Sequence, residues 1–245
     1  MKNIKITVLL GLLLTNSLIF SQGIIINDEV GVFLGPTFMQ TDYGEAENFS
    51  STMNNTGFGF GIAYIADFSD SRSNSGFGSA FTEHVKLRAE LSYSKANFAY
   101  DGLPIEGSNS ESAKFRAMEG TTKLLNLGLF TEIYIFNLNN KSKLQPYFLG
   151  GISYTAANPS LKSTLAYPSI YLPEEDNIFM EKQNTFSLTG GVGTRYKLDD
   201  IDILFEYRFN AFTSDRIEGL DSDFSGDKNN DAQTIFNLGI VFHLY

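Results

Sequence analysis

The chain has 245 residues, enough for one domain of ordinary size, and nothing in it marks a second. It lacks cysteine, which excludes a disulfide framework, a thiolate metal site and a lipid-modified cysteine anchor. A formal net charge of −10 argues against nucleic-acid binding, because an acidic surface repels phosphate. The 22 Phe, 12 Tyr and 22 Gly, set against only 6 Pro, favour strands with tight turns over helices.

The N-terminus has the pattern of an export signal. Two lysines precede the apolar run Ile6–Leu14, and the small residue Ser21 suits cleavage. We therefore predict a signal peptide over 1–21 and a single barrel domain over 22–245. A transmembrane anchor is the alternative, but the run is short and Thr15–Ser17 interrupts it.

Eight segments then alternate apolar with polar or small residues, the pattern of half-buried strands. In residues 85–94, for example, Leu87 and Leu91 share one face, and Arg88 and Glu90 share the other. In chain order the segments lie near 29–39, 57–64, 85–94, 124–136, 145–156, 186–196, 201–210 and 236–244. Their lengths of roughly 9–13 residues are close to what a tilted membrane strand requires.

The connections between these segments alternate in length. Those near 41–56, 96–122, 157–184 and 212–232 are long and polar, whereas 138–144 and 198–200 are short. Long loops outside and tight turns in the periplasm are typical of outer-membrane barrels, and an even strand number leaves both termini periplasmic. The connection 68–83 breaks the rule, and its run Ser69–Ser79 predicts a flexible insertion.

The composition of the two faces predicts which one meets lipid. The polar face combines charged side chains with many glycines, which suits a narrow lumen filled by side chains better than a solvated surface. We expect an ion-paired network in the lumen, formed by Arg88, Glu90, Glu132, Arg195, Glu206 and Arg208. We expect the lipid-facing side to include Leu87, Leu91, Leu127, Leu129, Phe205, Tyr207, Phe236, Leu238, Ile240 and Phe242. A soluble exported barrel that binds an apolar ligand would reverse the two faces.

The mature chain resembles the small outer-membrane barrels allied to the PorT and PorG families of bacteria with a type IX secretion system. The motifs concerned are Glu29–Gly35 with Asp42–Gly44, Leu87–Tyr93, Gly191–Leu198 and Phe212–Asp215. The resemblance implies an anchor that ties a periplasmic ring of the secretion machine to the outer membrane. The long second connection departs from the usual pattern of these families.

The chain's end also fits a barrel. Phe242, Leu244 and Tyr245 resemble the C-terminal signal read by the barrel-insertion machinery, although Tyr245 is out of phase with the other two. The expected contacts of the protein are therefore outer-membrane lipid, the insertion machinery during assembly, and periplasmic secretion-ring components.

Catalytic and cofactor signals are weak. Two histidines, His84 and His243, are expected near the periplasmic end, away from the outer leaflet where lipid-modifying barrel enzymes act, so a structural role is favoured. The segment Asp221–Gly226 begins like a calcium loop, but Ala232 replaces the bidentate glutamate. We predict a non-enzymatic protein without cofactor or metal; a lipid-modifying barrel enzyme is the least favoured alternative.

Overall fold

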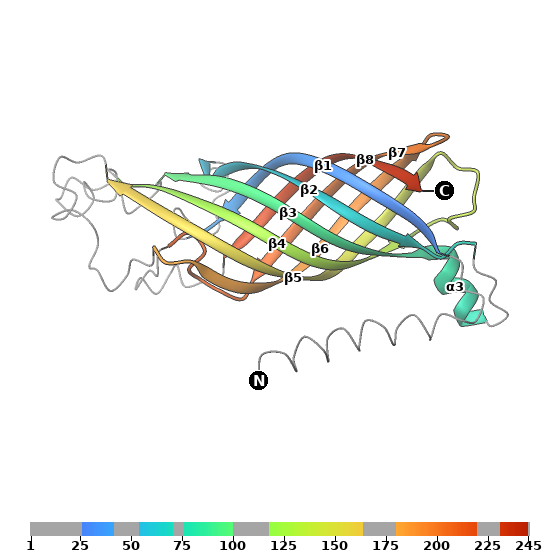
Figure 1. Cartoon of the computed structure of the whole chain (residues 1–245), viewed down its shortest axis with the longest axis horizontal. Coiled ribbons are helices and arrows are strands. Elements are labelled where there is room, and N and C mark those ends of the chain that lie inside the picture. Colours follow the sequence, from blue (N-terminus) through green and yellow to red (C-terminus); the bar gives the residue numbers. More distant parts are fainter. Residues whose placement is uncertain are drawn as a thin grey trace, which may run out of the picture.

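The protein is a closed barrel of eight antiparallel strands (Figure 1). The computed structural model describes residues 26–41, 54–70, 76–99, 118–163, 180–219 and 231–244. The strands are β1 (Asn27–Gln40), β2 (Thr56–Asp67), β3 (Val85–Ala99), β4 (Met118–Tyr134), β5 (Leu144–Ser163), β6 (Gln183–Lys197), β7 (Ile201–Phe212) and β8 (Ala232–Leu244). Each pairs with its neighbours in sequence, and β8 closes the barrel against β1. The predicted all-β, up-and-down architecture is confirmed.

The alternation in the sequence becomes an inside and an outside. Successive side chains of a strand point to opposite faces, and in β7 the burial alternates strictly from Asp202 to Asn210. Large apolar side chains are exposed on the outer face. The interior holds buried polar and charged side chains together with apolar clusters, one of which includes Met39, Leu124 and Phe212.

Strands β3, β4 and β5 are longer than the sequence pattern predicted. Pairing continues from Tyr93 opposite Leu125 to Ala99 opposite Glu119, and β5 follows β4 to the pair Met118–Ser163. The expected segments stopped earlier because the outward positions beyond Tyr93 are polar, which hides the alternation although the backbone ladder continues. The third connection is correspondingly shorter than 96–122.

The second connection contains a helix, which corrects the prediction of a flexible insertion for its later part. Helix α3 (Gly76–His84) leads directly into β3. It is held to the turn between β4 and β5, because the Leu138 amide donates to the Glu83 carbonyl (2.8 Å) and Asn137 donates to the Glu83 carboxylate (2.8 Å). A nine-residue helix that begins within a serine- and glycine-rich stretch has too weak a sequence pattern to be predicted without this partner surface.

The two ends of the barrel differ. The first residues of β1 pair with the last of β8, as in Asp28–Leu244, so β1 begins and β8 ends at the same end of the barrel. The same end carries α3 and the turns 135–143 and 198–200 (Figure 1). In the shorter turn the Leu198 amide donates to the Ile201 carbonyl (2.9 Å). Among the described residues, no helix is long and apolar enough to cross a membrane.

Candidate functional site: a charged cluster inside the barrel

The six residues expected in the lumen network all lie inside the barrel. Arg88 and Glu90 come from β3, Glu132 from β4, Arg195 from β6, and Glu206 and Arg208 from β7. Each is at most 3% exposed. Charges removed from water to this extent are tolerated only when they are paired and hydrogen-bonded, and the contacts below supply that pairing.

One half of the cluster centres on Arg208. Its two terminal nitrogens donate to the two carboxylate oxygens of Glu90, both at 2.7 Å, while its Nε donates to Glu206. Arg88 approaches Glu90 and Glu206 at 3.0 Å and Glu132 at 3.2 Å. The planar guanidinium suits this fork-to-fork pairing, which a lysine could not reproduce.

The other half runs toward the end at which β1 begins. Arg195 donates to Glu132 (2.7 Å) and to Glu29 (2.6 Å). Lys86 contacts Glu29 at 2.6 Å and Asp67 at 2.8 Å. Because Glu132 is shared with Arg88, the two halves form one continuous chain of ion pairs across the lumen.

Two buried tyrosines complete the hydrogen bonding of the carboxylates. Tyr147 donates to Glu206 and Tyr134 to Glu132, each at 2.6 Å. The cluster thus joins four cationic side chains to six carboxylates, namely Lys86, Arg88, Arg195 and Arg208 with Glu29, Asp67, Glu90, Glu132, Asp202 and Glu206. The carboxylates outnumber the cations by two, so the tyrosine donors add to the ion pairs in stabilising the buried ionised groups.

Aromatic rings lie on lumen glycines beside the arginines. Phe33 is paired with Gly61 on one neighbouring strand and with Gly239 on the other. A Cβ on Gly61 would lie 2.4 Å from the Phe33 ring, so the ring occupies space that only glycine leaves free. The guanidinium carbons of Arg88 and Arg208 lie 5.0 and 5.3 Å from the ring centroid, within cation–π range.

The interior beside this cluster has little free space. A cavity lined by Glu90, Arg208, Phe33 and Asn126, among others, measures about 10 Å³. That is close to the volume that a single water needs. In this part of the barrel, side chains leave no room for a ligand.

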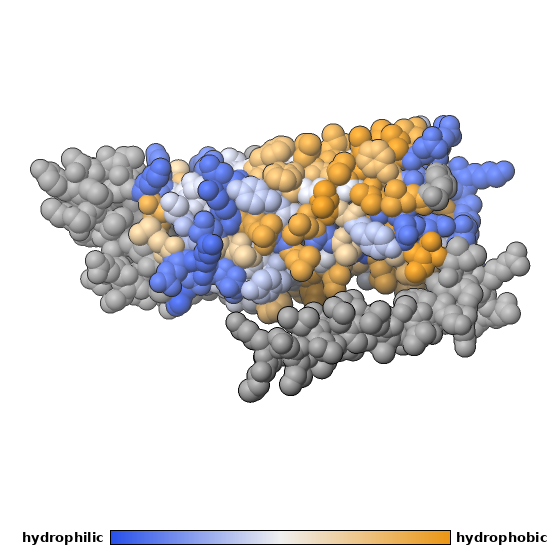
Figure 2. Space-filling view, in the orientation of Figure 1, coloured by the Kyte–Doolittle hydropathy of each residue, from blue (hydrophilic) through white to orange (hydrophobic). Residues whose placement is uncertain are grey.

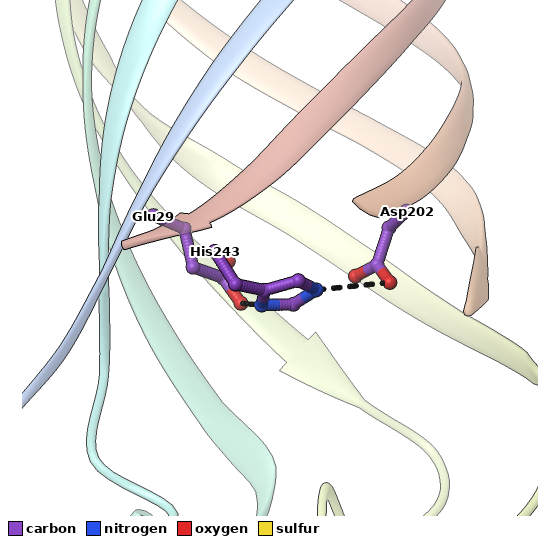
Figure 3. A group of neighbouring side chains, drawn as sticks. All are labelled: Glu29, Asp202 and His243. Atoms are coloured by element: carbon purple, nitrogen blue, oxygen red, sulfur yellow. Dashed lines mark hydrogen bonds and ion pairs between the residues drawn. The ribbon is translucent and has the colours of Figure 1, made fainter. Parts of the chain in front are cut away.

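A second group of charges surrounds His243, nearer the end of the barrel at which β1 begins (Figure 3). The ring's Nδ1 is 3.3 Å from Glu29, and its Nε2 is 3.3 Å from Asp202. His243 therefore links β1 to β7 from its position on β8, beside the seam that closes the barrel.

These three residues could offer one ligand atom each to a metal ion, since the atoms lie within 4.8 Å of one another. The surroundings disfavour that use. Both ring nitrogens already face a carboxylate, and Glu29 also contacts Lys86 and Arg195 at 2.6 Å. A metal ion would meet two fixed cations beside one of its ligands, so the group is better explained as part of the ion-pair chain.

His84, the other histidine, ends α3 and contacts the Tyr134 carbonyl through Nδ1 at 3.0 Å. It therefore ties the helix to the end of β4. Like His243, it lies at the end of the barrel where β1 begins.

The outside of the barrel is a broad apolar belt with hydrophilic bands at both ends (Figure 2). All ten residues expected to face lipid are exposed on it, with Leu129 the most exposed at 64%. Tyrosine and phenylalanine rings meet across strands on this face, as in Phe60–Tyr93 (5.6 Å) and Tyr207–Phe236 (5.1 Å between centroids).

Sequence reasoning missed several members of the cluster. Glu29, Lys86, Asp202 and Tyr147 belong to it, and so does the ring of Phe33. The alternation does place Lys86 and Asp202 on the polar faces of the segments 85–94 and 201–210, but the expected network did not include them. Phe33 carries a signal too, because it is out of phase with the apolar stripe of Val32 and Leu34.

Some predictions fall outside the described residues. These are the signal peptide, the motif Asp42–Gly44, the calcium-like segment Asp221–Gly226, and Tyr245 of the C-terminal signal. Phe242 and Leu244, its other two members, are exposed on the outer face of β8.

Comparison with known proteins supports the fold. No family model matches the chain, and no curated protein matches it in sequence. Among solved structures, a major outer membrane protein of Thermus thermophilus is similar at a TM-score of 0.50 and 13% identity, covering 89% of this chain and 99% of that one. Neisserial surface protein A has a TM-score of 0.48 at 14% identity, with 89% and 97% covered. The protease OmpT of Escherichia coli is also similar, with a TM-score of 0.37 and 10% identity, and with 91% and 99% covered.

Proposed function

We propose that this protein is a transmembrane barrel of the outer membrane with a structural, non-enzymatic role. The proposal rests on the distribution of side chains, which is the reverse of that in a soluble barrel. Apolar side chains cover the outside, and ionised side chains are buried inside. Hydrocarbon around the barrel favours the first arrangement, whereas water would favour the reverse. A soluble carrier of an apolar ligand needs an apolar cavity, whereas the centre of the described interior holds a charged cluster with little free space beside it.

Membrane insertion is tested by fractionation and gel mobility. We expect the full-length protein in the outer-membrane fraction, and we expect unboiled protein to migrate differently from boiled protein because the closed barrel resists detergent. Protein in the soluble periplasmic fraction with no mobility shift would refute the proposal.

Within this proposal, the end that carries α3 faces the periplasm, with both termini on that side. Short connections and a docked helix give this end a defined surface, held by contacts such as Asn137 to Glu83 and Asn139 to the Ser69 carbonyl (3.1 Å). Such a surface suits an anchor or assembly component that contacts periplasmic partners. Both histidines lie at this end in structural contacts, which favours a non-catalytic role.

The proposed export route adds a cleaved signal peptide over 1–21, insertion by the barrel-assembly machinery through the C-terminal strand, and a mature chain over 22–245. N-terminal sequencing of protein from outer membranes tests the cleavage. A mature chain that begins at Gln22 supports it, and an intact N-terminus contradicts it.

The narrower proposal is that the anchored partner is a periplasmic ring of the type IX secretion machine. It is supported by the motif resemblance to PorG-like barrels. Co-purification from mildly solubilised membranes tests it: ring components should be recovered with the tagged barrel, and not with an unrelated tagged outer-membrane barrel.

A further inference from the structure

Strands β3 and β4 carry an unusual charge arrangement just beyond the apolar belt. On the outer face of β3 and β4, the last belt residues are Tyr93 and Leu125, which are directly paired. The next outward pair is Lys95 opposite Lys123, and both side chains are exposed. Two lysines therefore lie side by side where the apolar surface ends.

Like charges directly opposite each other on a sheet destabilise the pairing unless a counter-charge is present. The outward neighbours of the pair supply none: they are Phe58 and Asn158 on the flanking strands, Tyr93 and Leu125 below, and Asn97 and Thr121 above. Within the described parts of the chain, neither lysine has an ion-pair partner. Lys162 differs, because the residue directly opposite it in the register of β4 and β5 is the acidic Glu119.

Above the lysine pair, the extension of β3–β5 forms a hollow of about 330 Å³ with both polar and apolar lining residues. Its lining includes Asn97, Thr121 and Ser160, whose amide and hydroxyl groups suit sugar hydroxyls. The pair thus lies between a surface for acyl chains and a surface for a sugar headgroup.

We propose that Lys95 and Lys123 bind a phosphate group of a phosphorylated glycolipid in the outer leaflet. The phosphate would bridge the two ammonium groups and relieve their repulsion, the acyl chains would lie along the belt below Tyr93 and Leu125, and the sugar would meet the hollow. A free anion would gain only the first of these contacts. The inference rests on the proposed function, because it needs the belt to lie in a membrane.

The test uses full-length protein inserted in nanodiscs of phosphatidylcholine with a small fraction of bis-phosphorylated lipid A. Lipid A retained by the barrel after extraction into mild detergent is counted by native mass spectrometry. The test variant is K95Q/K123Q. The matched control is K141Q/K143Q, which removes two exposed lysines from the turn at the opposite end.

We expect the wild type and K141Q/K143Q to retain lipid A equally, and K95Q/K123Q to retain roughly tenfold less, since each lysine at a membrane surface strengthens anionic-lipid binding several-fold. Dephosphorylated lipid A should be lost from the wild type to the same extent. In an uncharged detergent without lipid A, K95Q/K123Q should unfold at a higher urea concentration than the wild type, because the repulsion is removed.

Equal retention by K95Q/K123Q and the wild type would overturn the inference, as would equal retention of dephosphorylated lipid A. Displacement by millimolar inorganic phosphate would show that a free anion suffices, and would overturn the lipid assignment. Retention of phosphatidylglycerol at the level of lipid A would refute the glycolipid. Failure to enter nanodiscs at all would instead count against the proposed function, so the two failures are distinguishable.

Discussion

Single glycines decide how the barrel's interior is packed. Gly61 lies opposite Phe33, and Gly193 lies beneath the Tyr147 ring, where a Cβ would approach to 2.4 Å. Both rings contact the charged cluster, one by stacking on guanidinium groups and the other by donating to Glu206. The glycines thus let rings fit close to the wall and leave the centre to the ion pairs.

At Gly61, alanine should destabilise the barrel by about 1–3 kcal/mol, the usual cost of overpacking a filled interior. The measurement is urea unfolding of the inserted barrel. Gly150→Ala is the control, because a Cβ there meets nothing within 4 Å. Equal effects of the two substitutions would contradict the packing role.

Arg208 is the residue whose loss should cost most. Arg208→Met leaves Glu90 without its bidentate partner inside the barrel, and breaking a buried pair from one side costs about 3–5 kcal/mol. We expect the double variant Arg208→Met/Glu90→Gln to be markedly less destabilised than the sum of the two single variants. Additive losses in this double-mutant cycle would show that the pair is not coupled.

At the scale of the element, strands β3 and β4 each have two environments along their outer faces. In β4 the outward residues from Ile133 to Leu125 are mostly apolar, and those from Lys123 to Glu119 are polar. The change falls at the same register on β3, between Tyr93 and Lys95. A common border on neighbouring strands is what the edge of a hydrocarbon layer requires.

A charge placed within the belt should therefore cost far more than one placed beyond it. Leu129→Lys, near the middle of the outward apolar run of β4, should destabilise the inserted barrel by about 2–4 kcal/mol. Ser160→Lys, on the polar extension of β5, should have little effect on unfolding in the same bilayer. Similar costs at both positions would place the membrane boundary elsewhere.

At the scale of the whole molecule, the filled lumen distinguishes a plugged barrel from a channel. Eight strands leave an interior that side chains fill, and here they form a continuous chain of ion pairs from Asp67 to Arg208.

We expect no steady ion conductance when the protein is inserted in planar bilayers, in contrast to a general porin measured in parallel. The physical reason is that an ion would have to separate charges held at 2.6–3.2 Å to pass. Reproducible single-channel steps from wild-type protein would show that the cluster opens.

The sequence by itself determined the strand number, the connectivity and the sidedness of each strand, because a period of two assigns every residue to one face as soon as the strand is recognised. Arg88, Glu206 and Leu127 could be placed in this way without coordinates. Only closure of the barrel decided the partners: Arg208 meets Glu90 across 118 residues of sequence, and His243 reaches both β1 and β7. It also decided the true ends of β3–β5 and the position of α3, since backbone pairing and docking contacts persist where the side-chain pattern has faded.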